Sequence, residues 1–235
     1  MQTYLDIVNA VLRDINEVPL TATSFNNARG FHAFLKEAVN RALFDIANES
    51  EEWPWLASVP FNQDISMMTN STNTDRKVAI YDFDSSVSNV DWDTFVIIDE
   101  QKRTSHPLTP ISYEEWQRRG SHDLVAYHDD SSLSCPSVVY KTKDNSGFGL
   151  SPIPDKAYTV NYVSWKAPEF LVKYSDPIPF PDRYYGVLVN RALYYVWRFR
   201  DNVNQASLSL DNYTSSLKKM ERALIKPTFH RMRPV

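Results

Sequence analysis

The stretch DPIPFPDRYYGVLVNRALYYVWRFRDN, from Asp176 to Asn202, decides the fold. Three prolines open this stretch, and no other proline occurs within it. A proline in the first turn, with an unbroken run behind it, predicts a helix from Pro181 to about Asp201. Aromatic and aliphatic side chains occupy almost every side of this helix, so it must be buried nearly all round. Either the centre of a helical domain or contact with neighbouring subunits would provide that burial.

Three more helices are expected outside this stretch. Apolar residues recur at helical spacing in residues 3–17, 24–48 and 206–224. Pro19 ends the first of these helices, and Gly30 weakens the first turn of the second. Two pairs of helices therefore lie at the two ends of the chain.

The middle of the chain has a different pattern. Between residues 56 and 165, short pieces rich in Val, Ile, Tyr and Phe alternate with clusters of Pro, Asn, Asp and Ser, which is typical of strands and turns. The clearest piece is AYTVNYVSW, in which Tyr158, Val160 and Tyr162 face one way. We expect an antiparallel sheet or a small barrel, with a short helix inserted at Ile111–Gly120.

These elements predict an α+β fold, a four-helix bundle formed by the N- and C-terminal helices with an inserted antiparallel β-rich domain. Residues 1–55 and 166–226 would form the bundle, residues 56–165 the β-rich domain and residues 227–235 a C-terminal extension. The sequence VNRAL occurs in both helical parts, at Val39–Leu43 and again at Val189–Leu193. The repeat predicts similar positions for the two helices, with Asn40 and Arg41 matching Asn190 and Arg191.

Composition excludes several classes of function. The chain has 235 residues, a formal net charge of −4 and only 5 glycines. A protein that grips nucleic-acid phosphates usually has a basic excess, and Gly-rich phosphate-binding loops are absent. The single cysteine, Cys135, excludes an internal disulfide. No apolar run is long enough to span a bilayer, so no membrane contact is expected.

No pattern in the sequence carries a strong catalytic or metal-binding signal, so we expect no cofactor and no metal. HDLVAYHDD, from His122 to Asp130, is the best metal candidate, and the Asp82–Asp93 stretch is similar to a Ca²⁺ loop without its glycine and terminal glutamate. Solvated loops are the favoured interpretation of both. Three minor candidates are the thiol of Cys135, the adjacent carboxylates Glu114 and Glu115, and a hydrolase site built from His122, Asp123, His128 and Asp129.

Five segments carry a resemblance to a known family: VNAVLRDINEVPL, ARGFHAFLKEAVNRALFDI, EWPW, PIPDKAYTVNYVSWKAPEFLV and the opening stretch. Together they resemble the head-to-tail adaptors of tailed bacteriophages called tail tubular protein A. The resemblance covers both helical ends and the last strand, while the β-rich insertion looks larger than in compact members.

The resemblance implies a structural protein of the virion neck, assembled in the host cytoplasm, without catalysis or cofactor. It implies a homo-oligomeric ring, usually of twelve subunits, that binds the portal protein and encloses the channel for DNA during ejection. Further partners would be a tail nozzle or tail-tube protein and tail fibres, while DNA would pass without specific binding. An alternative is a tail-associated module whose β-rich domain attaches fibres or binds a carbohydrate or receptor.

Two groups of site residues follow. The basic C-terminal end would dock on the portal, and aromatic and arginine side chains near the third helix would form the subunit interface, because protein interfaces are enriched in both. Arg191→Glu is expected to block ring formation more than folding. The docking residues are Lys226, Phe229, His230, Arg231, Met232 and Arg233, and the interface residues are Arg41, Arg183, Tyr184, Arg191, Tyr195 and Arg198.

Overall fold

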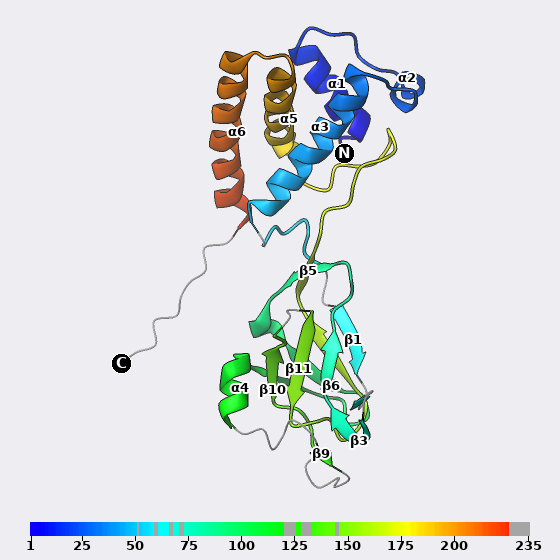
Figure 1. Cartoon of the computed structure of the whole chain (residues 1–235), viewed down its shortest axis with the longest axis vertical. Coiled ribbons are helices and arrows are strands. Elements are labelled where there is room, and N and C mark those ends of the chain that lie inside the picture. The colour runs from blue at the N-terminus through cyan, green and yellow to red at the C-terminus, as the bar shows by residue number, and fades with distance from the viewer. Residues whose placement is uncertain are drawn as a thin grey trace, which may run out of the picture. The chain divides into compact units, whose positions relative to one another are not determined.

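The computed structural model describes residues 1–50, 52–58, 61–65, 68–70, 73–119, 126–127, 133–143 and 146–225. It contains both helices and sheets, which confirms the α+β class. Contacts divide the chain into a helical unit, Met1–Leu56 with Ala167–Val235, and a β-rich unit, Ala57–Lys166 (Figure 1).

Helix α5 lies at the centre of the helical unit, where it packs against α1, α3 and α6 (Figure 1). It begins later than the prolines suggest, because a short 3₁₀ turn, η4, precedes it. The three neighbouring helices of the same chain provide most of the burial that the composition of α5 requires. The bounds are α1 Tyr4–Asp14, α2 Ala22–Asn26, α3 Phe31–Asn48, η4 Asp182–Tyr184, α5 Tyr185–Phe199 and α6 Val203–Leu224.

The helix expected over residues 24–48 is two helices, so that prediction was wrong in its first part. The chain leaves the helical path after α2 and re-enters at Gly30, the N-cap of α3. Gly30 has φ 56°, a left-handed conformation that glycine adopts without steric cost. Thr21 caps α2 through a reciprocal hydrogen-bond pair with Ser24, so the short helix has its own start signal.

The core of the helical unit joins residues from both ends of the chain, since Ile7 of α1 and Met220 of α6 belong to one buried cluster. Trp53 is fully buried, and its indole N–H donates to the Ile46 carbonyl oxygen at 2.8 Å. Tyr4 is buried at the start of α1 and donates to the Lys36 carbonyl oxygen at 2.6 Å. Burial of large side chains of this kind stabilises a fold by about 1.5–3 kcal/mol each.

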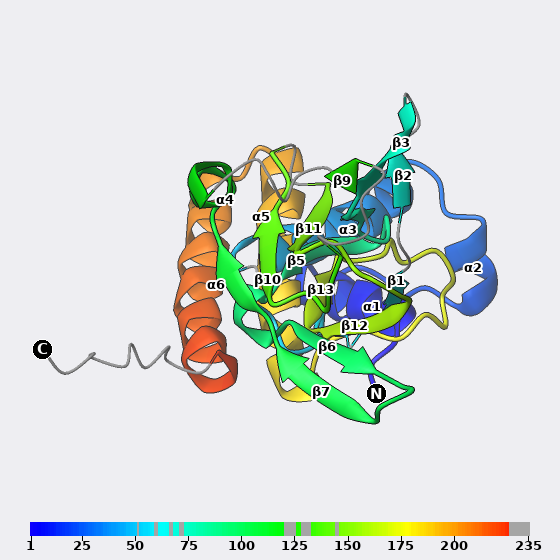
Figure 2. The same cartoon turned by 90° about the horizontal axis from the view of Figure 1, so that it is seen from below.

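Most strands of the β-rich unit pair antiparallel, as expected, but β8 pairs parallel with β10. The strand orders are β1-β12-β6-β7, β4-β11-β10-β8, β13-β5 and β2-β3-β9, and the β6–β7 hairpin is clear in Figure 2. The inserted helix is confirmed as α4, Tyr113–Arg119. Strand bounds are β1 Phe61–Ile65, β2 Met68–Asn70, β3 Asn73–Val78, β4 Ile80–Asp82, β5 Val87–Val90, β6 Val96–Asp99, β7 Thr104–Pro107, β8 Thr109–Ile111, β9 Ala126–Tyr127, β10 Val138–Lys141, β11 Gly147–Ser151, β12 Tyr158–Tyr162 and β13 Ser164–Lys166.

An aromatic cluster fills the core of the β-rich unit. The rings of Phe95 and Tyr162 stack with centroids 4.7 Å apart, and Phe148 meets both rings edge-on. Gly147 lets β11 approach β4 closely, because a Cβ atom there would lie 2.1 Å from the Tyr81 carbonyl oxygen. The expectation that Tyr158, Val160 and Tyr162 face one way agrees with their common burial in this core.

Alkaline solution should destabilise the β-rich unit through two buried tyrosines. Burial raises the pKa of Tyr81 and of Tyr162 to about 12, from an ordinary value of about 10. Because the folded-state pKa is the higher one, their contribution to stability is complete below pH 10 and is lost as the pH rises from about 10 through 12. Circular dichroism and tyrosinate absorbance, followed together over this range, should show ionisation coupled to unfolding.

Tyr81→Phe removes one of these ionisations and should move the alkaline unfolding midpoint to higher pH. Tyrosinate absorbance that rises fully before any change in the circular dichroism would contradict this account.

Candidate functional site

A cleft of about 480 Å³ opens between α3 and α5. The α5 residues 191, 194, 195 and 198 lie three or four positions apart, so they share one face of the helix. Four of the six predicted interface residues line this cleft, while Arg183 and Tyr184 lie in η4 and do not. We call it the arginine–aromatic cleft; its lining residues are Phe34, Arg41, Arg191, Tyr194, Tyr195, Arg198 and Phe199.

Arg191 is already paired inside the chain. Its Nε donates to Asp45 Oδ2 at 2.7 Å, and the Tyr195 hydroxyl donates to the same oxygen at 2.6 Å. The guanidinium carbon lies 5.0 Å from the ring centroids of Tyr194 and Tyr213 and 5.2 Å from that of Tyr195. Burial is the largest single influence and acts to lower the pKa of Arg191, but the hydrogen bond and charge of Asp45, together with Tyr195 and Tyr213, outweigh it and the pKa is raised.

Arg198 and Arg41 are the exposed cations of the cleft. Arg198 donates to the Tyr194 hydroxyl at 3.1 Å, and no described residue offers it a carboxylate. Arg41 forms an ion pair with Glu37 one turn earlier on α3, in which both side chains are more than half exposed. Exposed pairs of this kind contribute less than about 1 kcal/mol, so both cations remain accessible to a partner.

The other predicted residues lie elsewhere. Arg183 is exposed, and its guanidinium carbon lies 4.6 Å from the Tyr184 ring centroid. The six portal-docking residues, from Lys226 to Arg233, lie outside the described residues. So do His122, Asp123, His128 and Asp129.

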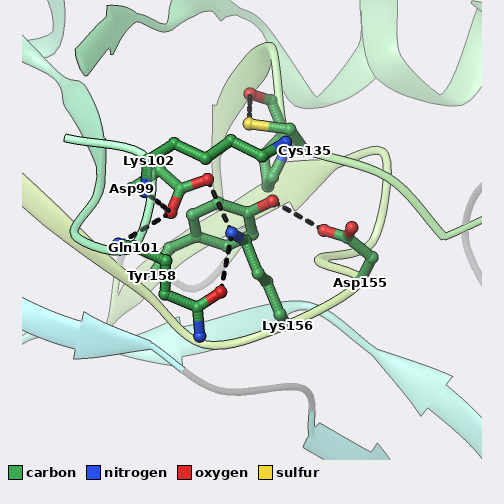
Figure 3. Close-up of polar contacts among 8 residues, drawn as sticks. Asp99, Gln101, Lys102, Cys135, Asp155, Lys156 and Tyr158 are labelled. Atoms are coloured by element: carbon green, nitrogen blue, oxygen red, sulfur yellow. Dashed lines mark hydrogen bonds and ion pairs between the residues drawn. The ribbon is translucent and has the colours of Figure 1, made fainter. Parts of the chain in front are cut away.

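A connected polar cluster of the β-rich unit surrounds Asp99 (Figure 3). Lys156 Nζ lies 2.6 Å from Asp99 Oδ2, and Asp99 Oδ1 accepts from the backbone of Gln101 and Lys102. The Lys156 hydrogen bond, above all, lowers the pKa of Asp99. The carboxylate thereby holds the β6–β7 turn, so this cluster has a structural role.

Tyr158 borders the same cluster and donates its hydroxyl to Asp155 at 2.6 Å (Figure 3). Burial first, and the bond to Asp155 next, raise its pKa far above the ordinary value. A phenol that stays protonated and donates to a carboxylate is neither a base nor a nucleophile at neutral pH.

The remaining candidate catalytic and metal-binding residues within the described chain are turn residues or exposed surface residues. In the proposed Ca²⁺ loop, Asp84 and Asp91 accept the backbone N–H of Ser86 and Asp93, as turn residues do. Among the described residues, no three His, Cys, Asp or Glu side chains lie together as a metal site, and no helix has the length and apolar character needed to cross a membrane. Cys135 is an exposed free thiol, and Glu114 and Glu115 are exposed on α4.

Sequence reasoning missed a second surface, the segment Glu169–Tyr174, which we call the strap. Within the strap, the side chain of Leu171 is buried, whereas those of Phe170, Val172 and Tyr174 are exposed. The available signal was the apolar run Phe170–Val172 followed by Tyr174, which lies outside every predicted helix and strand. A cavity of about 530 Å³ beneath the strap is lined by Tyr4, Lys36, Glu37, Asn40, Arg41, Phe170, Leu171 and Val172.

Asn40 holds the strap on α3. Its Nδ2 donates to the Leu171 carbonyl oxygen and its Oδ1 accepts the Leu171 N–H, both at 2.9 Å. Asp176 accepts the N–H groups of Val172 and Lys173, each at 2.7 Å. The backbone of the strap is therefore fixed before any partner arrives.

Asn40→Ala should lower the free energy of unfolding by about 2 kcal/mol, because it leaves both backbone groups of Leu171 without a partner. Asn190→Ala, at the matching position of the second VNRAL, is the control. Asn190 is also half-buried, but no described residue hydrogen-bonds its side chain, so a cost below about 0.5 kcal/mol is expected. Urea unfolding measures both, and equal costs would contradict the role of Asn40.

Comparison with known proteins supports an assignment for the whole chain. No curated protein matches the sequence. A family model described as SU10 adaptor protein matches residues 2–233, which span both helical segments and the β-rich unit. The resemblance to phage head-to-tail adaptors is thereby confirmed at the level of the family. The chain belongs to the SU10 adaptor protein family, a family of phage structural adaptors.

Proposed function

We propose that this protein is a neck subunit that forms a ring between the portal and the tail and lines the channel through which DNA passes. In this proposal the long helices act as a four-helix bundle that carries the β-rich domain as an insertion. The ring has twelve subunits, and its further partners are a tail nozzle or tail-tube protein and the tail fibres. It assembles in the host cytoplasm and works without catalysis or cofactor.

The match of an adaptor family over residues 2–233 carries this proposal. The charge supports it, because a net charge of −4 gives a DNA conduit little tendency to hold phosphates. The arginine–aromatic cleft also supports it, since its side chains are the kinds that interfaces favour. Electron microscopy of the full chain mixed with its cognate portal protein tests the proposal: rings on the portal are expected, and portals that stay bare would refute it.

Removal of residues 227–235 should weaken binding to the portal while the fold stays intact. Helix α6 ends at Leu224, so the truncation removes no residue of the helices. Binding measured by biolayer interferometry is expected to fall at least tenfold, and the thermal midpoint of unfolding should not change. Unchanged portal affinity would remove the docking role of Lys226, Phe229, His230, Arg231, Met232 and Arg233.

The alternative, a tail-associated binding module, has one observation in its favour. A cavity of about 450 Å³ beside α4 mixes an aromatic ring with polar side chains, as carbohydrate sites do. Its lining residues are Ser112, Tyr113, Glu114, Gln117, Lys141, Thr142 and Lys143. Binding of host-surface glycans by the full chain, abolished by Tyr113→Ala, would favour this function over the ring.

A further inference from the structure

The strap gathers three exposed large hydrophobic side chains within five residues. Phe170 is 66% exposed and Val172 is 71% exposed, and Tyr174 two residues later is 40% exposed. The Phe170 ring also lies against Phe44, with centroids 4.4 Å apart. Contiguous exposed apolar side chains on a fixed backbone mark a contact surface, because covering them removes apolar surface from water, which is favourable.

The arginine–aromatic cleft offers the chemistry that the strap needs. Phe199 is 54% exposed and stacks on Phe34 with centroids 4.3 Å apart, which provides an apolar wall. Beside this wall, Arg198 has no carboxylate partner among the described residues. The strap carries an exposed carboxylate, Glu169, directly before its most exposed ring. An acid followed by an aromatic side chain therefore matches a cation beside an aromatic wall.

The strap of a chain cannot fill the cleft of the same chain. Asn40 and Phe44 hold the strap, whereas Phe34 lines the cleft and lies roughly a third of a turn away around α3, with Arg41 bordering both surfaces. Burial of Leu171 and its two bonds to Asn40 keep the strap on its own side. The occupant of the cleft must come from another molecule, and another copy of this chain carries the matching segment.

We propose that the strap of one copy docks into the arginine–aromatic cleft of the next copy, with Glu169 paired to Arg198 and Phe170 packed against Phe199. The inference rests on the proposed ring, because it names the contact that repeats around it. Strap and cleft are two different patches, so the contact is heterologous and propagates from copy to copy.

Charge exchange tests the pairing in the full chain, alone and with the portal protein. Glu169→Arg and Arg198→Glu should each weaken self-association at least tenfold in sedimentation velocity, and the double exchange should restore it. Loss in the single variants without recovery in the double variant would overturn the pairing. Single variants that associate like the wild type would overturn it as well.

Cross-linking tests the geometry. In a Cys135→Ser background, Glu169→Cys combined with Arg198→Cys should be joined between copies by a short bismaleimide, as a ladder longer than two chains. A bifunctional reagent is needed because the long side chains of a Glu–Arg pair hold the two Cα atoms farther apart than the roughly 7 Å that a direct disulfide spans. The matched control combines Glu169→Cys with Leu208→Cys, since Leu208 is also 54% exposed but lies on α6. No cross-link above this control, with or without portal, would overturn the inference, and so would a ladder that stops at two. Rings on the portal without this cross-link would leave the proposed function standing and remove only the contact.

Discussion

Replacing Arg191 by glutamate should lower the free energy of unfolding of the helical unit by about 3 kcal/mol. In the wild type, Arg191 Nε lies 2.7 Å from Asp45 Oδ2. The substitution replaces this cation with a second carboxylate beside Asp45. It also removes the cation from beneath the rings of Tyr194, Tyr195 and Tyr213. The Arg191 side chain is only 18% exposed, so water does not replace what is lost. Thermal and urea unfolding of the full chain measure the effect.

This expected result changes the meaning of the substitution as a probe of assembly. From the sequence alone, Arg191→Glu would separate ring formation from folding, but the intramolecular pair with Asp45 means that it affects both. Arg198→Glu is the matched variant, because Arg198 is exposed and bonded only to the Tyr194 hydroxyl among the described residues. It should cost less than about 1 kcal/mol in stability. Equal destabilisation by both variants would contradict this distinction.

Trp53→Ala should lower the free energy of unfolding by about 4 kcal/mol, the largest effect we expect from a single truncation. The indole is fully buried, so its removal leaves a cavity, and the Ile46 carbonyl oxygen loses its donor. Urea unfolding of the full chain, followed by circular dichroism, measures the loss.

Phenylalanine variants of the two neighbouring tryptophans provide the control. Trp53→Phe keeps much of the volume but removes the hydrogen bond, so a cost of about 2 kcal/mol is expected. The indole N–H of Trp55 has no partner among the described residues, so Trp55→Phe removes an unpaired donor and should cost less than about 1 kcal/mol. A larger cost for Trp55→Phe than for Trp53→Phe would contradict this account of the core.

Local patterns predicted the elements well where one pattern dominated. The apolar spacing after Pro181 marked α5, and the alternation in AYTVNYVSW marked β12. Where two signals competed, prediction failed. The apolar spacing of residues 24–48 continued across Gly30, but the left-handed conformation at that residue divides the segment into α2 and α3.

The sequence indicated four of the residues that line the candidate site, but not the contacts that they make inside the chain. Arg41, Arg191, Tyr195 and Arg198 do meet in one cleft, because helical spacing places them on facing sides of two packed helices. Nothing in the spacing indicated that Asp45 would neutralise Arg191. The two residues are 146 positions apart, and only the packing of α3 against α5 brings them together.

The sequence by itself determined the class of this protein: its α+β elements, a central apolar helix and a resemblance to phage adaptors. These follow from periodicity, composition and residue order, which are properties of the chain before it folds. The tertiary structure alone decided which arginines are already paired inside the chain. It alone also decided that Asn40 holds the backbone of the strap, so that the apolar side chains of the strap are exposed. Both depend on contacts between distant parts of the chain, and a carboxylate or an amide can satisfy a partner only after packing has placed the two together.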